Sequence, residues 1–533
     1  MNCKTVCLLC LPLSAFGMTQ AAWSEQSKPR IIITTDGEID DMNGFIRFLH
    51  YANEFETEGL VYTSSMWHYA GDGRGTRFTS RMPHTARRYG ERTELRWTGT
   101  NWMQGFIDLY AKSHENLLRH KPDFPSPKHL KSLVRVGNIE FEGEMEKVTE
   151  GSELIRQVLL DDKAGPVHVQ IWGGTNTLAR ALKCIEQAYR ETDQWETIHR
   201  RVSEKAVLYI ILGQDMTYEE YVLPNRPDIK AIFNRRQPRG FAYGWRGSAP
   251  KAFHRNLDGQ WFSANILNDR GPLLARYFTY GDGQPVVGDY DVRFHQMEET
   301  IRRGHQQYDL ISEWDTPAWL YNLDPAFGLR QPGDPPSYGG LGGRFKASNK
   351  GPRKWNDVES EEADTPVVDL NPFTGKPDPY YAQTRWIPVL QNDFAARALW
   401  NGKAPGQVNR PPVVTLKHPR RLTARTGQRV ELRGSASDPD GDELAYSWWQ
   451  YVEAGTYRGA VRIEDTNGPE AAIVVPEDAR TGDTIHLLLE VTDDGTPPLT
   501  RFQRVVVEVT GATPADRGQL PGRNVKPSLA AGS

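Results

Sequence analysis

The chain has 533 residues, too many for a single ordinary domain, and this length indicates two or three domains. Its 64 basic and 68 acidic residues give a formal net charge of −4, so nothing in the charge balance indicates a polyanionic partner. We therefore expect no nucleic acid and no membrane among the partners.

Residues 1–22 have the composition of a secretory signal peptide, with one lysine followed by an apolar run from about Thr5 to Phe16. A run this short does not span a bilayer core, which needs roughly 20 residues. Leu9 directly before Cys10 argues against a lipoprotein anchor. We expect an exported protein, periplasmic or extracellular, whose mature chain has no internal disulfide because only Cys184 remains in it.

An apolar strand followed by acids begins the first domain. Residues 31–33 are three isoleucines, as in a strand buried on both faces of a parallel sheet. Asp36, Asp40 and Asp41 follow, and an amphipathic helix comes next. Ligands of open α/β sheets bind at this carboxyl end of the strand. The acids repel one another unless a cation such as Ca²⁺ lies between them; the alternative is an acidic N-cap of the helix.

Four later apolar runs also end in polar residues. In chain order they are 58–66 before His68, 166–172 before Asn176, 206–212 before Asp215, and 308–312 before Asp315. Helical patterns lie between them, which predicts a parallel, doubly wound α/β domain over residues 29–400 with all these strands in one sheet. Right-handed crossovers then bring the strand ends to one edge. A loop cap for His68 and a helix N-cap for Asp315 remain as structural alternatives.

The pattern changes after residues 401–412, which have linker composition. Short alternating segments separated by turn residues then predict an all-β, Ig-like sandwich over 413–510, which we expect to fold when expressed alone. Residues 511–533 are predicted to be a disordered tail. The acids at 438–442 and 493–494 either hold Ca²⁺ between strand ends or form ordinary turns.

The run TTDGEIDD, from Thr34 to Asp41, resembles the amino-terminal signature of the calcium-dependent nucleoside hydrolases, Asp-x-Asp-x-x-x-Asp-Asp. Thr34 stands in place of the first acid. The resemblance implies that Asp36 binds Ca²⁺ and takes a proton from water, that Asp41 is a second Ca²⁺ ligand, and that Asp40 holds ribose hydroxyls.

Later positions extend this resemblance. It implies that the carbonyl of Trp172, which precedes a glycine pair, and the carboxylate of Asp315 complete the Ca²⁺ site. It also implies that His68, Asn176 and Trp314 bind substrate. Trp314 stands where nucleoside hydrolases have a histidine near the leaving base, so protonation of the leaving group departs from that family.

The whole order of segments resembles a bacterial family of cellulose-associated nucleoside-hydrolase-like proteins with a C-terminal Ig-like domain. Residues 65–68, 313–317 and 342–345 also support this resemblance. It implies a secreted hydrolase of glycosidic bonds, N-ribosyl bonds first, with Ca²⁺ as cofactor and a small nucleoside or carbohydrate as substrate. The alternative is a non-catalytic protein that binds plant cell-wall polysaccharide such as cellulose through the same pocket or through the sandwich.

Overall fold

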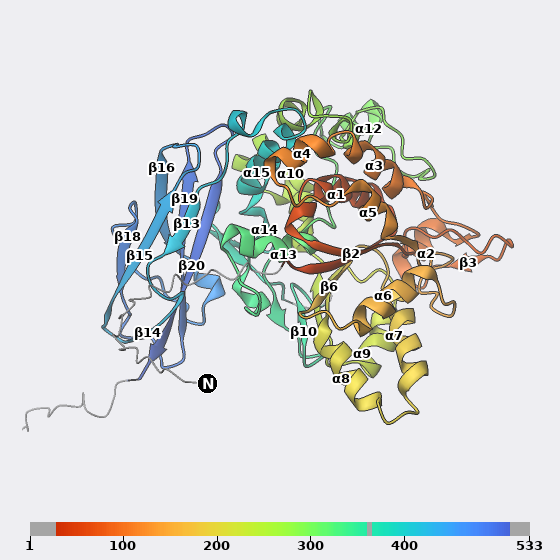
Figure 1. Cartoon of the computed structure of the whole chain (residues 1–533), viewed down its shortest axis with the longest axis horizontal. Helices are drawn as coiled ribbons and strands as arrows, with labels where there is room; N and C mark the ends of the chain where they lie inside the picture. Colours follow the sequence, from red (N-terminus) through yellow and green to blue (C-terminus); the bar gives the residue numbers. More distant parts are fainter. Residues whose placement is uncertain (1–27, 360–364, 512–533) are drawn as a thin grey trace, which may run out of the picture.

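The structure is a computed structural model that describes residues 28–359 and 365–511. The predicted signal peptide and nearly all of the predicted tail lie outside these residues. Figure 1 shows an α/β unit beside a β-sandwich. None of the described helices is long and apolar enough to cross a membrane.

The main sheet has eight strands in the order β5-β2-β1-β6-β7-β8-β10-β9. The strands are β1 (Arg30–Thr35), β2 (Glu56–Tyr62), β5 (Val134–Val136), β6 (Val167–Ile171), β7 (Ala206–Ile211), β8 (Lys230–Asn234), β9 (Lys346–Ala347) and β10 (Lys354–Asn356). All neighbours pair in parallel except β9 with β10. All six residues of β1 are buried, and the strand lies between β2 and β6, which confirms the predicted central strand.

Helices cover both faces of this sheet (Figure 1). The described helices of this unit are α1 (Ile39–Leu49), α2 (Pro83–Tyr89), α3 (Trp102–Ala111), α4 (His114–His120), α5 (Pro127–Ser132), α6 (Glu150–Leu160), α7 (Asn176–Tyr189), α8 (Trp195–Lys205), α9 (Leu223–Asn225), α10 (Trp245–Ser248), α11 (Gly259–Phe262), α12 (Met297–Arg302), α13 (Pro317–Phe327), α14 (Tyr381–Thr384) and α15 (Ile387–Leu399). Ile31 and Ile33 pack with α1, α3, α13 and α15, whereas Ile32 packs with α6, α7 and α8. The three isoleucines thus enter two separate cores, as the alternation of a strand requires.

One predicted strand is wrong. Residues 308–312 add no strand to the sheet, and Leu310 forms only an isolated bridge with Thr279. The backbone of this segment bonds to loops instead, since the Leu310 amide donates to the Leu257 carbonyl and the Tyr280 amide to the Asp309 carbonyl. The backbone N–H and C=O groups of such a short apolar run can bond to loop backbone as well as to a neighbouring strand. The strand that follows β7 in the sheet is β8, whose apolar run is only three residues long.

The C-terminal unit is a sandwich of two four-stranded sheets, β13-β15-β18-β17 and β14-β20-β19-β16. Its strands are β13 (Val413–Leu416), β14 (Arg421–Arg425), β15 (Arg429–Ser437), β16 (Leu444–Gln450), β17 (Ile463–Glu464), β18 (Glu470–Val474), β19 (Thr484–Asp493) and β20 (Thr500–Thr510). Two short ribbons complete the chain, β3 (Phe78–Thr79) with β4 (Glu91–Arg92) and β11 (Asp369–Asn371) with β12 (Lys376–Asp378). Trp448 is buried in the core between the two sandwich sheets.

The sandwich packs firmly on the α/β unit. Tyr451, Leu488 and Phe502 of the sandwich belong to the same apolar core as α13 and α15. Arg504, which is fully buried, donates from Nε to the Leu329 carbonyl at 2.5 Å. The sheet that contains β19 and β20 is therefore covered on both faces, on one by the other sandwich sheet and on the other by the α/β unit.

Candidate active site at the carboxyl edge of the sheet

The turn after β1 positions the strand-one acids. Asp36 follows the strand, and Gly37 has φ +81°, a conformation that favours glycine. A Cβ on Gly37 would lie 2.4 Å from Oγ1 of Thr98, whose hydroxyl donates to the Gly37 carbonyl at 2.9 Å. This tight turn starts α1 at once and places Asp40 and Asp41 in its first turn.

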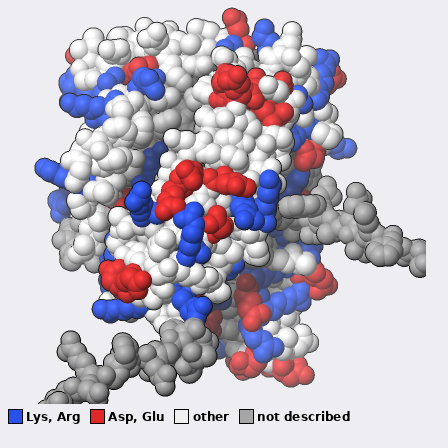
Figure 2. Space-filling model, turned by 90° about the vertical axis from the view of Figure 1, so that its left-hand side faces the viewer, with Lys and Arg blue, Asp and Glu red and all other residues white. Residues whose placement is uncertain are grey.

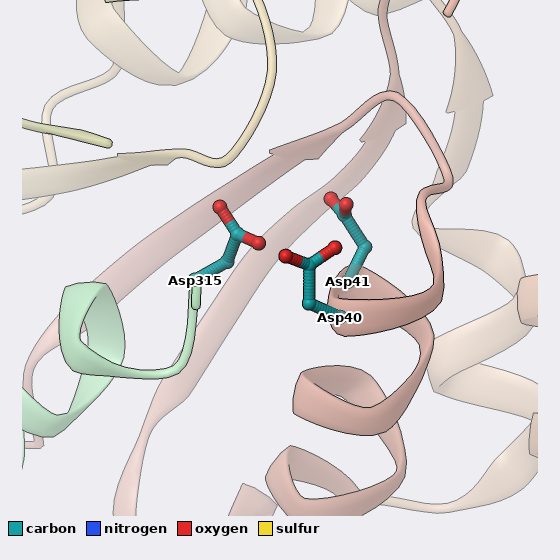
Figure 3. A group of neighbouring side chains, drawn as sticks. All are labelled: Asp40, Asp41 and Asp315. Carbon is teal, nitrogen blue, oxygen red and sulfur yellow. The ribbon is translucent and has the colours of Figure 1, made fainter. Parts of the chain in front are cut away.

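Three carboxylates converge at this edge. Asp40, Asp41 and Asp315 each offer an oxygen, and these oxygens lie within 4.8 Å of one another. Figure 3 shows Asp40 and Asp41 at the start of α1, facing Asp315 on the loop that enters α13. The side chains come from segments more than 270 residues apart, and none is more than 4% exposed.

Like charges at close range dominate the electrostatics of this cluster. Burial, followed by the charges of neighbouring acids, raises the pKa of all three carboxyls well above the usual range. Among the described residues, Oδ1 of Asp40 and Oδ1 of Asp315 have no hydrogen-bond partner. Buried acceptors without donors call for an explanation, and a cation with a preference for oxygen ligands supplies one.

Helix capping accounts for only one member of the cluster. Asp41 accepts from Oγ1 of Thr35 at 2.6 Å and from the Glu38 amide at 3.1 Å, and so completes a capping box at the start of α1. The N-cap of α13 is Thr316, and no side-chain hydrogen bond caps this helix. Asp315 therefore does not act as the helix cap that was its structural alternative.

Asp36 lies beside the cluster. It is 1% exposed, and neither of its oxygens has a hydrogen-bond partner among the described residues. Its nearest cation is His68, whose Nδ1 lies 3.4 Å from Oδ2 of Asp36, a long contact without hydrogen-bond geometry. Its charge raises the pKa of Asp41. The three carboxylates that converge are Asp40, Asp41 and Asp315, whereas the resemblance implied Asp36, Asp41 and Asp315. The role of Asp36 as base and ligand therefore stays a prediction.

The Trp172 carbonyl is already engaged. It accepts a hydrogen bond from Nε2 of Gln214 at 2.5 Å. Oε1 of Gln214 has no partner among the described residues, so this amide has one polar atom to spare. A carbonyl ligand at Trp172 would share its oxygen with Gln214 or displace that amide. Gln214 follows the 206–212 run directly before Asp215, but its contact with Trp172 has no sequence signal.

His68 lies between two acids. Its Nε2 is 3.3 Å from Oδ2 of Asp289, and Arg96 donates twice to Asp289, at 2.8 Å each. Burial and Arg96 lower the pKa of His68, but the carboxylates of Asp289 and Asp36 outweigh them and raise it to about 9. His68 is therefore a buried cation next to Asp36. Asp289 is 221 residues away in sequence, so no local pattern indicated this contact.

Asn176 is fully occupied by structural contacts. Its Oδ1 accepts from Thr63, and its Nδ2 donates to Oγ of Ser64 and to the carbonyls of Asn138 and Glu144. The residue is 0% exposed and does not line the cavity described next. Its predicted role in substrate binding gains no support from these contacts.

A cavity of about 340 Å³ opens above the three carboxylates. Its other lining residues are mainly aromatic and basic: Trp67, Tyr243, Phe294, Trp314, Arg88, Arg96 and Arg303. The Tyr243 and Phe294 rings lie 5.0 Å apart, and Arg303 lies over the Phe294 ring at 4.5 Å. Acids at the floor suit hydroxyl groups, and aromatic walls suit a flat apolar face.

The mostly parallel sheet and the acids at its carboxyl edge agree with a match to the model of a nucleoside hydrolase-like domain. The chain belongs to the cellulose-binding Sde182 family: residues 30–345 match the model described as "Cellulose-binding Sde182, nucleoside hydrolase-like domain". Residues 429–509 match "Cellulose-binding protein Sde0182, C-terminal domain".

One solved structure agrees on the fold. A nucleoside hydrolase-related hypothetical protein from Saccharophagus degradans, associated with carbohydrate metabolism, has 25% sequence identity and a TM-score of 0.64. That match covers 91% of this chain and 100% of the other. A plant nucleoside hydrolase, PpNRh1, matches at 10% identity with a TM-score of 0.31, over 69% of this chain and 99% of the other. None of the curated proteins matches the chain.

Proposed function

We propose that the protein is a secreted hydrolase of glycosidic bonds, N-ribosyl bonds first, that acts on a nucleoside or a related small carbohydrate with Ca²⁺ as cofactor. The observation that carries this proposal is the convergence of Asp40, Asp41 and Asp315 beneath an aromatic cavity. Buried carboxylates held this close cost free energy unless a cation or a substrate proton offsets their charge.

The residues present fit Ca²⁺. Asp36, Asp41, Asp315 and the Trp172 carbonyl would hold it, and Asp40 offers a further carboxylate in the same group. All of these ligand atoms are oxygens, the type that Ca²⁺ prefers. Among the described residues, Asp36, Asp315 and Asp40 each have at least one carboxylate oxygen without a hydrogen-bond partner. When bound, Ca²⁺ would neutralise the carboxylates and make a water molecule more acidic.

Three side chains of the protein then have separate roles in the reaction. Asp36 accepts the proton of the attacking water, because its oxygens are free of other donors. The water adds to the anomeric carbon as the glycosidic bond breaks and oxocarbenium character develops there. The leaving group departs with the electron pair of that bond and takes its proton from solvent water. Asp40 binds the sugar hydroxyls through Oδ1, while Ser312 donates to its Oδ2 at 3.3 Å and holds the carboxylate in place. Trp314 packs against the flat face of the sugar or the leaving group.

The test compares two substitutions at one position. Asp36→Asn keeps the shape and one oxygen but cannot accept a proton, whereas Asp36→Ala removes both functions. We expect Asp36→Asn to lower the turnover of a nucleoside by about 10²- to 10⁴-fold with little change in substrate affinity. Asp162→Asn is the control, because that side chain is 99% exposed. Wild-type turnover in Asp36→Asn would refute the assignment of the base.

A second candidate function is a non-catalytic protein that binds polysaccharide, which the description of the family as cellulose-binding favours. The exposed sandwich sheet offers little support for it. Arg429 ion-pairs there with Glu431 and Glu464, and Figure 2 shows acidic and basic side chains side by side on this face. Trp449 packs against Trp386 of the α/β unit instead.

Cellulose retention separates the two functions. If the cavity binds the polysaccharide, Trp314→Ala should lower retention on cellulose, and no nucleoside or glycoside should be turned over by the wild type. Glu431→Gln on the sandwich is the matched control. Retention that is unchanged in Trp314→Ala would exclude the cavity as the polysaccharide site.

A further inference from the structure

Two acidic loops meet at one end of the sandwich. The first, residues 438–442, lies between β15 and β16, and the second, residues 493–495, begins at the last residue of β19. Leu444 pairs with Asp493 across these strands. The Glu443 amide donates to Oδ1 of Asp494 at 2.9 Å, and the Asp494 amide donates back to the Glu443 carbonyl at 3.2 Å. The loops are therefore fixed side by side by their own backbone.

The first loop brings three carboxylates together. Oxygens of Asp438, Asp440 and Asp442 lie within 4.8 Å of one another. Ligand oxygens on opposite sides of a Ca²⁺ ion are about 5 Å apart, because each lies roughly 2.3–2.6 Å from the ion. Oδ1 of Asp438 accepts from the amides of Asp440 and Asp442, at 2.7 Å and 3.2 Å. Its Oδ2 is buried and has no hydrogen-bond partner among the described residues.

Asp493 adds a buried carboxylate from the second loop. It is only 3% exposed, and its Oδ1 alone accepts the bonds that shape the turn, from Gly495, Leu499 and Asn409. Oδ2 of Asp493 has no partner among the described residues. Asp493 pairs with Leu444 across β16 and β19, and Leu444 is two residues after Asp442. The carboxylate of Asp493 therefore lies at the same end of the sandwich as the first loop.

An ordinary turn does not explain these free oxygens. The hydrogen bonds of the turns use Oδ1 of Asp438 and Oδ1 of Asp493, and both Oδ2 atoms remain without a hydrogen-bond partner among the described residues. Arg410 ion-pairs with Asp440 at 2.7 Å, and in the part of the chain that the structure describes no other cation forms an ion pair with the acids of these two loops. Five carboxylates of the two loops are therefore offset by one guanidinium.

We propose that Asp438, Asp440 and Asp442 bind Ca²⁺ at this end of the sandwich, with Asp440 shared between the ion and Arg410 and Asp493 as a further ligand from the second loop. The site is separate from the acids of the α/β unit and does not depend on the proposed hydrolase activity. Asn409 and Arg410 belong to the linker and contact Asp493 and Asp440. Bound Ca²⁺ therefore ties the linker to the sandwich. Affinities of Ca²⁺ sites in extracellular modules are about 10⁻⁴ to 10⁻³ M, which sets the range of the titration.

The test is a calorimetric titration of the full chain with CaCl₂ in an Asp41→Ala/Asp315→Ala background, which removes two carboxylates of the cluster in the α/β unit. We expect one bound Ca²⁺ in this background and none after Asp438→Asn and Asp442→Asn are added. Glu508→Gln, at an exposed position of β20, is the control and should leave the stoichiometry unchanged. One Ca²⁺ of the same affinity in the Asp438→Asn/Asp442→Asn protein would overturn the proposal.

Asp493→Asn is a second test, which does not depend on correct folding of the Asp438→Asn/Asp442→Asn variant. The asparagine keeps Oδ1 as acceptor for the turn and changes only Oδ2, so the fold should persist, as circular dichroism can verify. We expect Ca²⁺ affinity at least tenfold lower than in the background protein. An unchanged affinity in the folded Asp493→Asn protein would likewise overturn the proposal.

Discussion

Substitution of Arg47 should loosen the connection between the two elements that bear the carboxylate cluster. Arg47 lies on α1, and its Nε is 2.8 Å from Oε2 of Glu313, two residues before Asp315. Both side chains are at most 1% exposed. Arg47 also donates to Oε1 of Gln391 at 2.5 Å, and Tyr277 donates its hydroxyl to Glu313. The ion pair therefore fixes the Asp315 loop against α1.

The size of the effect follows from burial. Arg47→Met removes the charge but keeps most of the length, and it leaves Glu313 as a buried anion with Tyr277 as its remaining strong donor. Breaking a buried pair in this way costs about 3–5 kcal/mol. The double variant Arg47→Met/Glu313→Gln removes the unpaired charge too, so we expect it to recover most of that loss. Arg190→Met breaks an exposed pair with Glu186 and should cost under about 1 kcal/mol.

Urea unfolding followed by tryptophan fluorescence measures these differences, and a CaCl₂ titration of the same proteins reports on the cluster. Arg47→Met should bind Ca²⁺ more weakly than Arg190→Met, because the Asp315 loop is no longer held against α1. An Arg47→Met protein within about 1 kcal/mol of the wild type, or a double variant less stable than Arg47→Met, would refute this reasoning.

Three further results are expected. Burial raises the pKa of Glu142 to about 7 from an ordinary 4.5, despite a hydrogen bond from Ser80, so the native state holds this proton more tightly than the unfolded chain does. The wild type therefore loses stability as pH rises from 4.5 through 7. Glu142→Gln should be up to about 3 kcal/mol more stable than the wild type at pH 8 and equally stable at pH 4. An equal gain in thermal stability at both pH values would contradict this. Residues 411–511 alone should fold, because all strand partners are internal, but should bind a hydrophobic dye through the uncovered face that contains Phe502; absence of dye binding would show that this face closes by itself. No histidine lines the cavity among the described residues, and Trp314 stands where nucleoside hydrolases have a histidine. An aryl riboside with a good leaving group should therefore be hydrolysed at least 10²-fold faster than a purine nucleoside, and equal rates would indicate another acid.

Local sequence patterns were sufficient for the architecture. The isoleucines of β1 and the alternation of strands and helices depend on neighbours in the chain, and they predicted the central strand and the sheet edge that bears the acids. The 308–312 segment failed because a short apolar run does not specify which backbone it bonds to.

The details of the site depend on contacts between distant segments. Asp289 and Arg96 reach His68 from positions 193 residues apart from each other, so no motif indicated them. Asp40 joins Asp41 and Asp315 because the turn at Gly37 fixes the start of α1. The sequence motif identified the acids but not which of them face one another, since that depends on the packing of α1 against the loop before α13.

The most direct test of the proposed function is a crystal structure with Ca²⁺ and a nucleoside analogue that is not hydrolysed. We predict one Ca²⁺ ion roughly 2.3–2.6 Å from carboxylate oxygens of Asp36, Asp41 and Asp315 and from the Trp172 carbonyl, which is then released from Gln214. We also predict the sugar hydroxyls on Asp40. Crystals grown in millimolar Ca²⁺ with no ion at this cluster, and with the analogue absent from the cavity above it, would contradict the proposal.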